Sequence, residues 1–361
     1  MGKDITFLIP SMNGGGAEKV TMLVANELYE RGWHITLLVS KFEGPYLYRL
    51  NKGINIKVLG NRNISKNIWE ISQYLRKSRP SIFYSSMMYV NVIAGLSAKI
   101  AGYKGKLIFS EHSNISTMME NNSSSKIPII LYFAKKLYPM AFGVLCVSDG
   151  VKDDLQEHIK KIKKAVVIHN PVEDLFTKNI EKSSKYRLVS MGRLDRDKNF
   201  KHLILSFNEV LNEVGNPDNY ELYIVGEGYE RRNLEQLIVE LKLQGKVILP
   251  GFLESPAEIL HSSHLFVFPS VREGFGNVLV EALSCGLPIV STDCPSGPSE
   301  ILMDGKIGAL VPVGDIKAMK NAIIKEIKQP NCISTVEERI ARANDFSVKK
   351  VVDAYEIFFK G

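Results

Sequence analysis

Two acidic residues, Glu273 and Glu281, stand eight positions apart in the string Glu-Gly-Phe-Gly-Asn-Val-Leu-Val-Glu. An apolar run predicts a strand that ends at Phe268, so Glu273 falls on the following loop and Glu281 on the next helix. The glycines let the backbone approach a ligand, and the N–H groups of Val278 and Leu279 at the helix start suit a phosphate. Carboxylates accept from vicinal hydroxyls, so Glu281 suits a ribose and Glu273 a transferred sugar. The alternative is a capping Glu273 and a surface Glu281.

A cationic pair forms the second cluster. Arg193 and Lys198 lie five positions apart, just after the predicted strand Tyr186–Met191. Two fixed cations at the end of a strand can neutralise a diphosphate and stabilise the charge on a departing phosphate. Between them, Asp195-Arg196-Asp197 spells Asp-x-Asp, which holds a metal in some enzymes, but we expect no metal here. The alternative for the pair is a solvated turn.

Polar residues also follow two predicted strands in the first half of the chain. Gly15 and Gly16 open the first helix, where backbone N–H groups can cradle an anion. His112 follows the predicted strand Lys106–Ser110 and can hydrogen-bond a sugar hydroxyl. Glu111 either binds the same sugar or orients His112. The alternative for His112 is a structural role.

The positions of these residues depend on the strands that they follow. The sequence predicts strands that alternate with helices in two successive series. The first series has predicted strands at Ile5–Ile9, His34–Val39, Ile54–Val58, Ser81–Ser85, Lys106–Ser110, Gly143–Val147 and Val166–Ile168. The second has them at Tyr186–Met191, Tyr220–Val225, Lys246–Leu249, His264–Phe268, Pro288–Ser291 and Ala309–Val311. The predicted helices between the strands are Ala17–Arg31, Ile64–Arg79, Asn91–Ala101, Ile127–Leu137, Gly150–Ile159, Phe200–Val214, Glu230–Leu241 and Asn277–Ser284, with further helices to the end of the chain. This alternation predicts doubly wound parallel sheets, whose ligands bind beyond the carboxyl ends of the strands.

The polar stretch Asn179–Lys185 separates the two series and is interpreted as a linker. A length of 361 residues suits two domains, expected at 1–180 and 181–345. The composition, 45% hydrophobic and 24% charged, is that of an ordinary globular protein and excludes disorder for most of the chain. No apolar run is long enough to span a membrane, so we expect a cytoplasmic protein.

The charge is uneven along the chain. Residues 1–180 hold 24 Lys and Arg against 14 Asp and Glu, whereas the remainder holds 22 against 25. A basic half can face nucleic acid, an anionic membrane or a phosphorylated substrate. The stretch Lys126–Pro139 joins an apolar run to Lys135 and Lys136, which predicts peripheral contact with the inner face of the cytoplasmic membrane. The alternative is an ordinary core-facing helix with a charged edge.

Together these strings resemble the retaining GT-B glycosyltransferases of family four. The resemblance is carried by the Glu-x7-Glu element at 273–281, Gly-Arg-Leu and Lys at 192–198, the Gly-Gly-Gly-Ala loop at 14–17, His-Asn-Pro-Val at 169–172, and Cys-Pro-Ser-Gly-Pro-Ser-Glu-Ile-Leu at 294–302. It covers nearly the whole chain. It implies an α/β fold of two Rossmann-like domains facing a central cleft. The first domain binds the acceptor, the second binds the nucleotide sugar, and the last helix (about 346–361) packs back on the first.

The resemblance also implies roles for residues that match the family's motifs. The catalytic set is Arg193, Lys198, Glu273 and His112. The donor-binding set is Gly15, Gly16, Arg193, Lys198, Glu273, Phe275, Gly276, Asn277, Val278, Leu279 and Glu281. No metal and no cofactor is expected, and a UDP-sugar is the donor substrate. Retention would proceed without a protein nucleophile, the acceptor hydroxyl attacking on the face that the nucleotide leaves.

The strings Ser-Glu-His-Ser-Asn at 110–114 and Pro-Ser-Gly-Pro at 295–298 are most similar to transferases that extend undecaprenyl-diphosphate-linked glycans. The expected reaction moves a hexose or N-acetylhexosamine, with GalNAc as first choice, from a UDP-sugar to a lipid-diphosphate-linked glycan. The product would belong to an O-antigen or capsule-like surface polysaccharide.

Two other functions stay open at this point. A nucleotide-sugar 2-epimerase of the same GT-B fold would act on the donor alone. A non-enzymatic nucleotide or nucleic-acid binder would use the basic half, but that half lacks the interleaved aromatic residues of a single-strand groove, so no nucleic-acid partner is expected.

Overall fold

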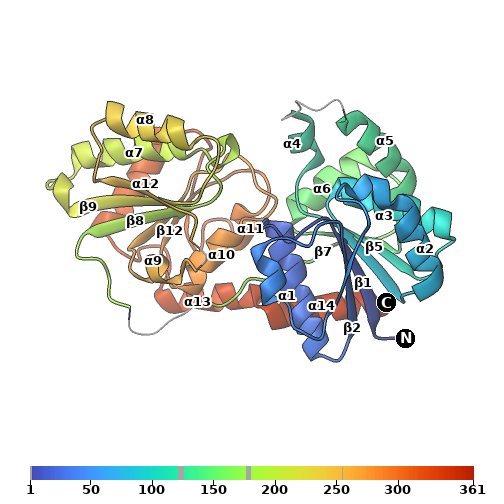
Figure 1. The fold of residues 1–361 in the computed structure, drawn as a ribbon. Coiled ribbons are helices and arrows are strands. Elements are labelled where there is room, and N and C mark those ends of the chain that lie inside the picture. The colour runs from blue at the N-terminus through green and yellow to red at the C-terminus, as the bar shows by residue number, and fades with distance from the viewer. Residues whose placement is uncertain (1, 121–125, 176–179, 254) are drawn as a thin grey trace. The chain divides into compact units, whose positions relative to one another are not determined.

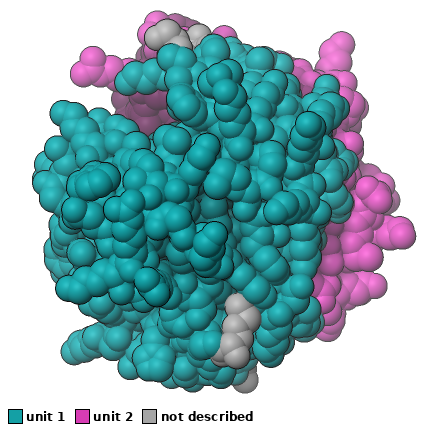
Figure 2. Space-filling model, turned by 90° about the vertical axis from the view of Figure 1, so that its right-hand side faces the viewer, with its two compact units in different colours: residues 1–171, 348–361 teal, residues 172–347 magenta. Residues whose placement is uncertain are grey.

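The computed structural model describes residues 2–120, 126–175, 180–253 and 255–361 (Figure 1). The chain forms two compact units, residues 1–171 with 348–361 and residues 172–347, coloured separately in Figure 2. We expected boundaries after residues 180 and 345. The structure divides the chain between Pro171 and Val172 and again between Ser347 and Val348. Of the predicted linker Asn179–Lys185, residue 179 lies outside the described residues and the rest belongs to the second unit.

Unit 1 is built on a seven-stranded parallel sheet in the order β3-β2-β1-β4-β5-β6-β7. The strands are β1 (Asp4–Ile9), β2 (His34–Val39), β3 (Asn55–Val58), β4 (Ile82–Ser86), β5 (Lys106–Glu111), β6 (Gly143–Cys146) and β7 (Ala165–Val167). The helices are α1 (Gly16–Glu30), α2 (Ile68–Ser78), α3 (Met88–Ala101), α4 (Ile115–Glu120), α5 (Ile127–Leu137), α6 (Asp149–His158) and α14 (Val348–Lys360), with short 3-10 turns η1 (Pro45–Arg49), η2 (Ile64–Asn67) and η3 (Tyr138–Met140).

The side chains of β1 alternate between the two faces of this sheet. Phe7 packs with α1 and α14 in one apolar cluster, whereas the neighbouring Thr6 hydroxyl lies 3.0 Å from the hydroxyl of Tyr74 on α2. In Figure 1 the terminal helix α14 lies beside α1, with which it is in contact. Arg31 after α1 ties the two together through an ion pair with Glu356 (3.0 Å). Helix α14 is therefore part of the core of unit 1.

Unit 2 repeats the plan with a six-stranded parallel sheet in the order β10-β9-β8-β11-β12-β13. The strands are β8 (Tyr186–Met191), β9 (Tyr220–Val225), β10 (Val247–Gly251), β11 (Leu265–Phe268), β12 (Ile289–Thr292) and β13 (Ala309–Val311). The helices are α7 (Phe200–Glu213), α8 (Arg231–Glu240), α9 (Ala257–His261), α10 (Asn277–Ser284), α11 (Pro298–Leu302), α12 (Ile316–Lys328) and α13 (Val336–Ala343), with η4 (Arg196–Lys198), η5 (Pro217–Asn219) and η6 (Asn344–Phe346).

The predicted fold class, two doubly wound α/β domains, is confirmed. Strand order reverses between β1 and β4 in unit 1 and between β8 and β11 in unit 2. In such sheets ligands bind at the reversal, outside the carboxyl ends of the strands. The short helices α4 and α9 were not predicted, because five or six residues are too few to show a helical period. Among the described residues no helix is long and apolar enough to cross a bilayer.

Candidate functional site

The reversal point of unit 2 brings two of the predicted site residues into contact. Strands β8 and β11 are hydrogen-bonded neighbours, with Leu188 opposite Leu265. Lys198 lies beyond the end of β8 and Glu273 beyond the end of β11, and the Lys198 ammonium is hydrogen-bonded to Glu273 Oε1. The same oxygen accepts a hydrogen bond from Ser270 Oγ (2.7 Å). The pairing of two parallel strands thus joins residues 75 positions apart.

The backbone of the two loops reinforces this contact. Lys198 N donates to the side chain of Asp195 (3.1 Å), which caps the short turn η4, and Val271 N donates to Asp197 O (2.8 Å). The Arg272 guanidinium lies 3.6 Å from the Asp197 carboxylate. Both acids of the Asp-x-Asp string are therefore occupied in positioning the loops. Among the residues that the structure describes, no group of three or more His, Cys, Asp or Glu is arranged to hold a metal ion.

Arg193 differs from Lys198 in its exposure. Its side chain is 83% exposed and forms an ion pair with the Asp195 carboxylate (3.3 Å). A guanidinium held this loosely can turn toward an incoming anion at little cost, because its attraction to Asp195 is screened by water. Of the two predicted cations of the β8 loop, Lys198 is therefore held by its ion pair with Glu273, whereas Arg193 is exposed to solvent.

Helix α10 carries the second acid of the motif. Glu281 is only 6% exposed, so the alternative of a surface acid is wrong. The helix is preceded by Gly276 in a left-handed conformation (φ 99°), and the carboxylate of Glu273, three residues before it, pairs with Lys198 and Ser270. The N–H of Leu279 donates to Gly276 O (2.9 Å), which corrects the expectation that this group is free. A phosphate at the helix start would meet Val278 first.

The residues between Glu273 and Glu281 are held in place by contacts of Phe275. The Phe275 side chain is buried, and its carbonyl oxygen lies where a Cβ on Gly297 would stand. Gly297 has φ 97° and begins α11, in the Pro-Ser-Gly-Pro string. Only glycine permits both the positive φ at position 297 and the close approach of the Phe275 carbonyl oxygen. The carbonyl of Phe275, and with it the start of the backbone that runs on through Gly276 and Asn277, is thereby placed against the start of α11.

The glycine loop of unit 1 has a more restricted environment than expected. Gly15 is the N-cap of α1, and the carboxylate of Glu18 lies directly against it. An acid already stands at this helix start, where it is favoured by the helix dipole. A phosphate at Gly15 and Gly16 would have to displace the Glu18 carboxylate.

His112 lies at the carboxyl end of β5 in unit 1. Its Nε2 is 3.1 Å from Ser110 Oγ, and the residue is half-buried. Burial lowers the pKa of His112 to about 4, so the ring is neutral at pH 7. A neutral imidazole can donate one hydrogen bond to a sugar hydroxyl or accept one from it.

Glu111, next to His112, is buried within a polar network rather than facing a ligand. Its Oε1 accepts hydrogen bonds from Tyr138 Oη and from Asn91 Nδ2 (2.9 Å). Asn91 also donates to Ser110 O (3.0 Å) and accepts from Ser85 Oγ (2.7 Å). This network ties the ends of β4 and β5 to α3 and η3, so of the two roles considered for Glu111 the geometry favours orienting the His112 loop.

Asn91 and Tyr138 were missed as contributors to the site. One signal was present in the sequence: Asn91 is a polar residue within the apolar run Met-Met-Tyr-Val-Asn-Val-Ile-Ala of α3. A polar side chain on an apolar helix face has to find a partner in the core. Its partners are distant in sequence, and only the fold identifies them.

Comparisons with known proteins identify the family of the chain. Residues 14–174 match the family model described as Glycosyltransferase Family 4, and residues 171–344 match the model described as Glycosyl transferases group 1. A Campylobacter jejuni protein named N-acetylgalactosamine-N,N'-diacetylbacillosaminyl-diphospho-undecaprenol 4-alpha-N-acetylgalactosaminyltransferase is 31% identical over 337 residues, covering 86% of each chain. A second protein of that organism, a GalNAc-GalNAc-diNAcBac-PP-undecaprenol alpha-1,4-N-acetyl-D-galactosaminyltransferase, is 25% identical and covers 97% of this chain and 96% of its own.

Solved structures establish the same fold. HepE of Anabaena in complex with UDP superposes with a TM-score of 0.81 at 21% identity, over 99% of both chains. TarM of S. aureus superposes with a TM-score of 0.79 at 13% identity, over 100% of this chain and 99% of its own. The fold is therefore GT-B. The chain belongs to glycosyltransferase family 4 and is a glycosyltransferase.

The buried Glu111 carboxyl gives a prediction about stability. Burial raises the pKa of Glu111 from 4.5 to about 7, even though the hydrogen bonds from Tyr138 and Asn91 favour the carboxylate. Between these two pH values the folded chain holds a proton that the unfolded chain releases. The contribution of Glu111 to the free energy of unfolding of unit 1 should therefore fall by about 3 kcal/mol as pH rises from 4.5 to 7 and stay level above 7. The lowered pKa of His112 contributes with the opposite sign, so the Glu111 contribution is read from the difference between the native chain and a variant that lacks this carboxyl.

Glu111→Gln should remove this contribution, so the variant should gain stability relative to the native chain across that range. Urea unfolding followed by tryptophan fluorescence measures it, because both tryptophans, Trp33 and Trp69, lie in unit 1. The control is Glu157→Gln, which changes an exposed carboxyl on α6. Parallel pH curves for Glu111→Gln and the native chain would contradict the prediction.

Proposed function

We propose that the chain transfers N-acetylgalactosamine from UDP-GalNAc to a lipid-diphosphate-linked glycan, with retention of the anomeric configuration and without a metal ion. The observation that carries the proposal is the contact between Lys198 and Glu273 at the β8/β11 reversal. It places a cation and a carboxylate side by side, as a molecule with an anionic diphosphate and a hydroxyl-rich sugar requires. The names of the two Campylobacter relatives support the sugar and the lipid-linked acceptor.

In this proposal the donor lies across the carboxyl ends of β8 and β11. Lys198 and Arg193 bind the diphosphate, and the start of α10 at Val278 contributes a backbone donor. Glu281 of α10, whose side chain is largely buried, accepts hydrogen bonds from the ribose hydroxyls. Glu273 binds a hydroxyl of the transferred sugar, and the backbone of Phe275, Gly276 and Asn277 contacts the same sugar. The UDP complexes of HepE support a uridine nucleotide.

The reaction forms one glycosidic bond and breaks the bond between the anomeric carbon and the UDP phosphate oxygen. The acceptor hydroxyl attacks on the face that UDP leaves, and its proton passes to the departing phosphate oxygen. Lys198 and Arg193 stabilise the negative charge that grows on this phosphate. His112 hydrogen-bonds the sugar as a neutral donor or acceptor. No protein nucleophile takes part.

The acceptor would reach the enzyme at the inner face of the cytoplasmic membrane, in the synthesis of an O-antigen or capsule-like polysaccharide. Helix α5 supports this assignment because it is apolar on two sides. Leu131, Ala134 and Leu137 are buried, whereas Ile129 is 59% exposed and Tyr132 55% exposed. Lys135 and Lys136 stand in the last turn. Exposed apolar side chains beside lysines suit an anionic lipid surface.

A donor screen tests the reaction. Native enzyme is incubated with UDP-GalNAc, UDP-GlcNAc, UDP-galactose or UDP-glucose and a synthetic polyprenyl-diphosphate glycan, and products are measured by mass. We expect one added GalNAc with an α coupling in the NMR spectrum, unchanged by EDTA. An inverted product would contradict retention. Conversion of the donor alone into another nucleotide sugar would instead support the epimerase.

Lys198→Met should reduce kcat by about 10²- to 10³-fold, because it removes a charge that stabilises the leaving phosphate. The matched control is Lys201→Met, which removes the same charge from an exposed position in the first turn of α7. Steady-state kinetics with saturating donor measures the difference. Equal kcat values for the two variants would exclude Lys198 from the catalytic set.

Charge reversal on α5 tests the membrane contact. Lys135→Glu with Lys136→Glu should lower the fraction of enzyme that sediments with phosphatidylglycerol vesicles, because each lysine contributes about 1 kcal/mol near an anionic surface. The control is Lys317→Glu with Lys325→Glu, which makes the same charge change on α12 of unit 2. Equal binding to anionic and neutral vesicles, or equal loss in both double variants, would disprove the contact.

A further inference from the structure

The loop between Glu273 and Asn277 is supported by Phe346, an aromatic residue that lies outside the sequence motifs that carry the family resemblance. Phe275 points inward, and its ring meets Phe346 of η6 edge-on, with centroids 5.4 Å apart and planes at 64°. Both side chains are 2% exposed. This is the geometry that aromatic pairs prefer, and it fixes the orientation of both rings. The side chain of Phe346 therefore forms part of the support of the loop between Glu273 and Asn277.

Arg342 holds Phe346 in turn. Its guanidinium carbon lies 4.6 Å from the centre of the Phe346 ring. The same guanidinium donates to Glu300 O (2.7 Å) and Ile301 O (3.0 Å) in α11, the helix that begins beside Gly297. Gly297 touches the carbonyl of Phe275. The side chain and the carbonyl of Phe275 are thus fixed by one connected set of contacts.

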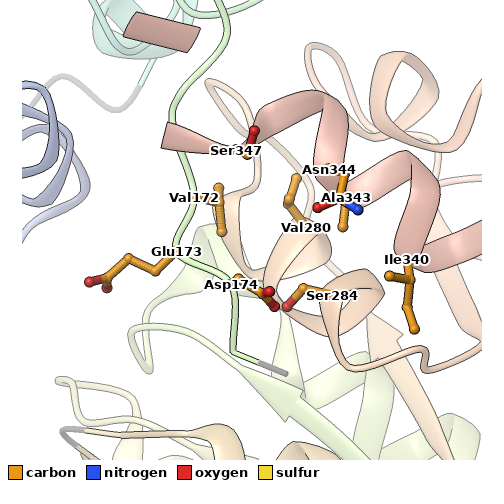
Figure 3. A pocket seen from close by; sticks show the side chains of 9 residues that line it. All are labelled: Val172, Glu173, Asp174, Val280, Ser284, Ile340, Ala343, Asn344 and Ser347. Carbon is orange, nitrogen blue, oxygen red and sulfur yellow. The ribbon is translucent and has the colours of Figure 1, made fainter. Parts of the chain in front are cut away.

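The backbone of Phe346 makes a second connection, to the segment that enters unit 2. Val172 N donates to Phe346 O (2.9 Å), and Val172 pairs with Ser347 in a parallel bridge. Figure 3 shows Val172 lying toward Val280, and Asp174 beside Ser284, around a small pocket. Val280 and Ser284 belong to α10, the helix of Glu281. Phe346 therefore makes two connections to the site. Its ring contacts Phe275 in the loop between Glu273 and Asn277, and its carbonyl oxygen is hydrogen-bonded to Val172, which lies against the flank of α10.

We propose that Phe346 is a positioning residue for the transferred sugar. It fixes Phe275 and, through it, the backbone of Gly276 and Asn277. The inference rests on the proposed function, in which this backbone touches the sugar. A misplacement of about 1 Å at a positioning contact can lower a rate by about 100-fold. UDP lacks the sugar, and a side-chain variant keeps the backbone hydrogen bond from Val172 N to Phe346 O that connects this residue to the flank of α10. The affinity for UDP should therefore be nearly independent of the Phe346 ring.

The test compares Phe346→Leu with Phe207→Leu in the full chain. Phe207 is a fully buried phenylalanine of α7 in the main apolar cluster of unit 2, so the control removes the same atoms from the same unit. Three quantities are measured: the melting temperature, the Kd for UDP, and kcat/KM for UDP-GalNAc. We expect kcat/KM to fall about 10- to 100-fold in Phe346→Leu and less than threefold in Phe207→Leu, with UDP Kd within about twofold of native in both. Phe346→Met, whose unbranched and flexible side chain can adapt to the space that the ring leaves, should show the same split if Phe346→Leu does not fold.

Two outcomes would overturn the inference alone. One is an equal kcat/KM in the Phe346 and Phe207 variants. The other is a loss of UDP affinity in Phe346→Leu as large as the loss of kcat/KM, since that describes a collapsed site and not a misplaced sugar. A native enzyme that neither binds UDP nor transfers a sugar would overturn the proposed function, and this inference with it.

Discussion

The ionic contact between Lys198 and Glu273 is the constraint on which the rest of the site depends. Both side chains are largely buried, and a buried charge is costly unless it is paired and hydrogen-bonded. The pair exists because β8 and β11 are parallel neighbours on opposite sides of the reversal in strand order, so their following loops meet. Asp195, Asp197 and Ser270 then fix these loops. A cation and a carboxylate are thus held ready for a ligand that carries both phosphate and hydroxyl groups.

Unit 1 also contains a buried carboxyl group, but this group is stabilised by hydrogen bonds in place of an ion pair. Its strand order also reverses, between β1 and β4, and β5 lies beside β4. At the end of β5 the buried Glu111 is satisfied by Tyr138 and Asn91, and burial raises its pKa toward neutrality. Buried polar networks of this kind fix one arrangement of the surrounding backbone when all members are satisfied. Here the backbone so fixed is the loop that carries His112.

The main elements of the fold could be predicted because their signals are local. Strands such as β2, β8, β9 and β13 and helices α5 and α10 have the predicted bounds, since apolar runs and helical periods are visible within a dozen residues. The domain boundary was predicted at residue 180 from a polar stretch, whereas the units separate at Pro171, because compactness depends on contacts distant in sequence. The start of α3 was predicted at Asn91, whereas the helix begins at Met88. It follows Met87, which adopts a positive φ that the local sequence does not indicate.

For the site, the sequence by itself determined which residue types follow which strands, and so the set Arg193, Lys198, Glu273 and Glu281 and the family to which the chain belongs. Only the tertiary structure decided how these residues are used. It paired Lys198 with Glu273, buried Glu281, turned Glu111 inward and placed Phe346 beneath Phe275. The physical reason is that motif spacing is a local property of the chain. Desolvation, ion pairing and ring packing depend on neighbours that only the closed sheet and its helices bring together.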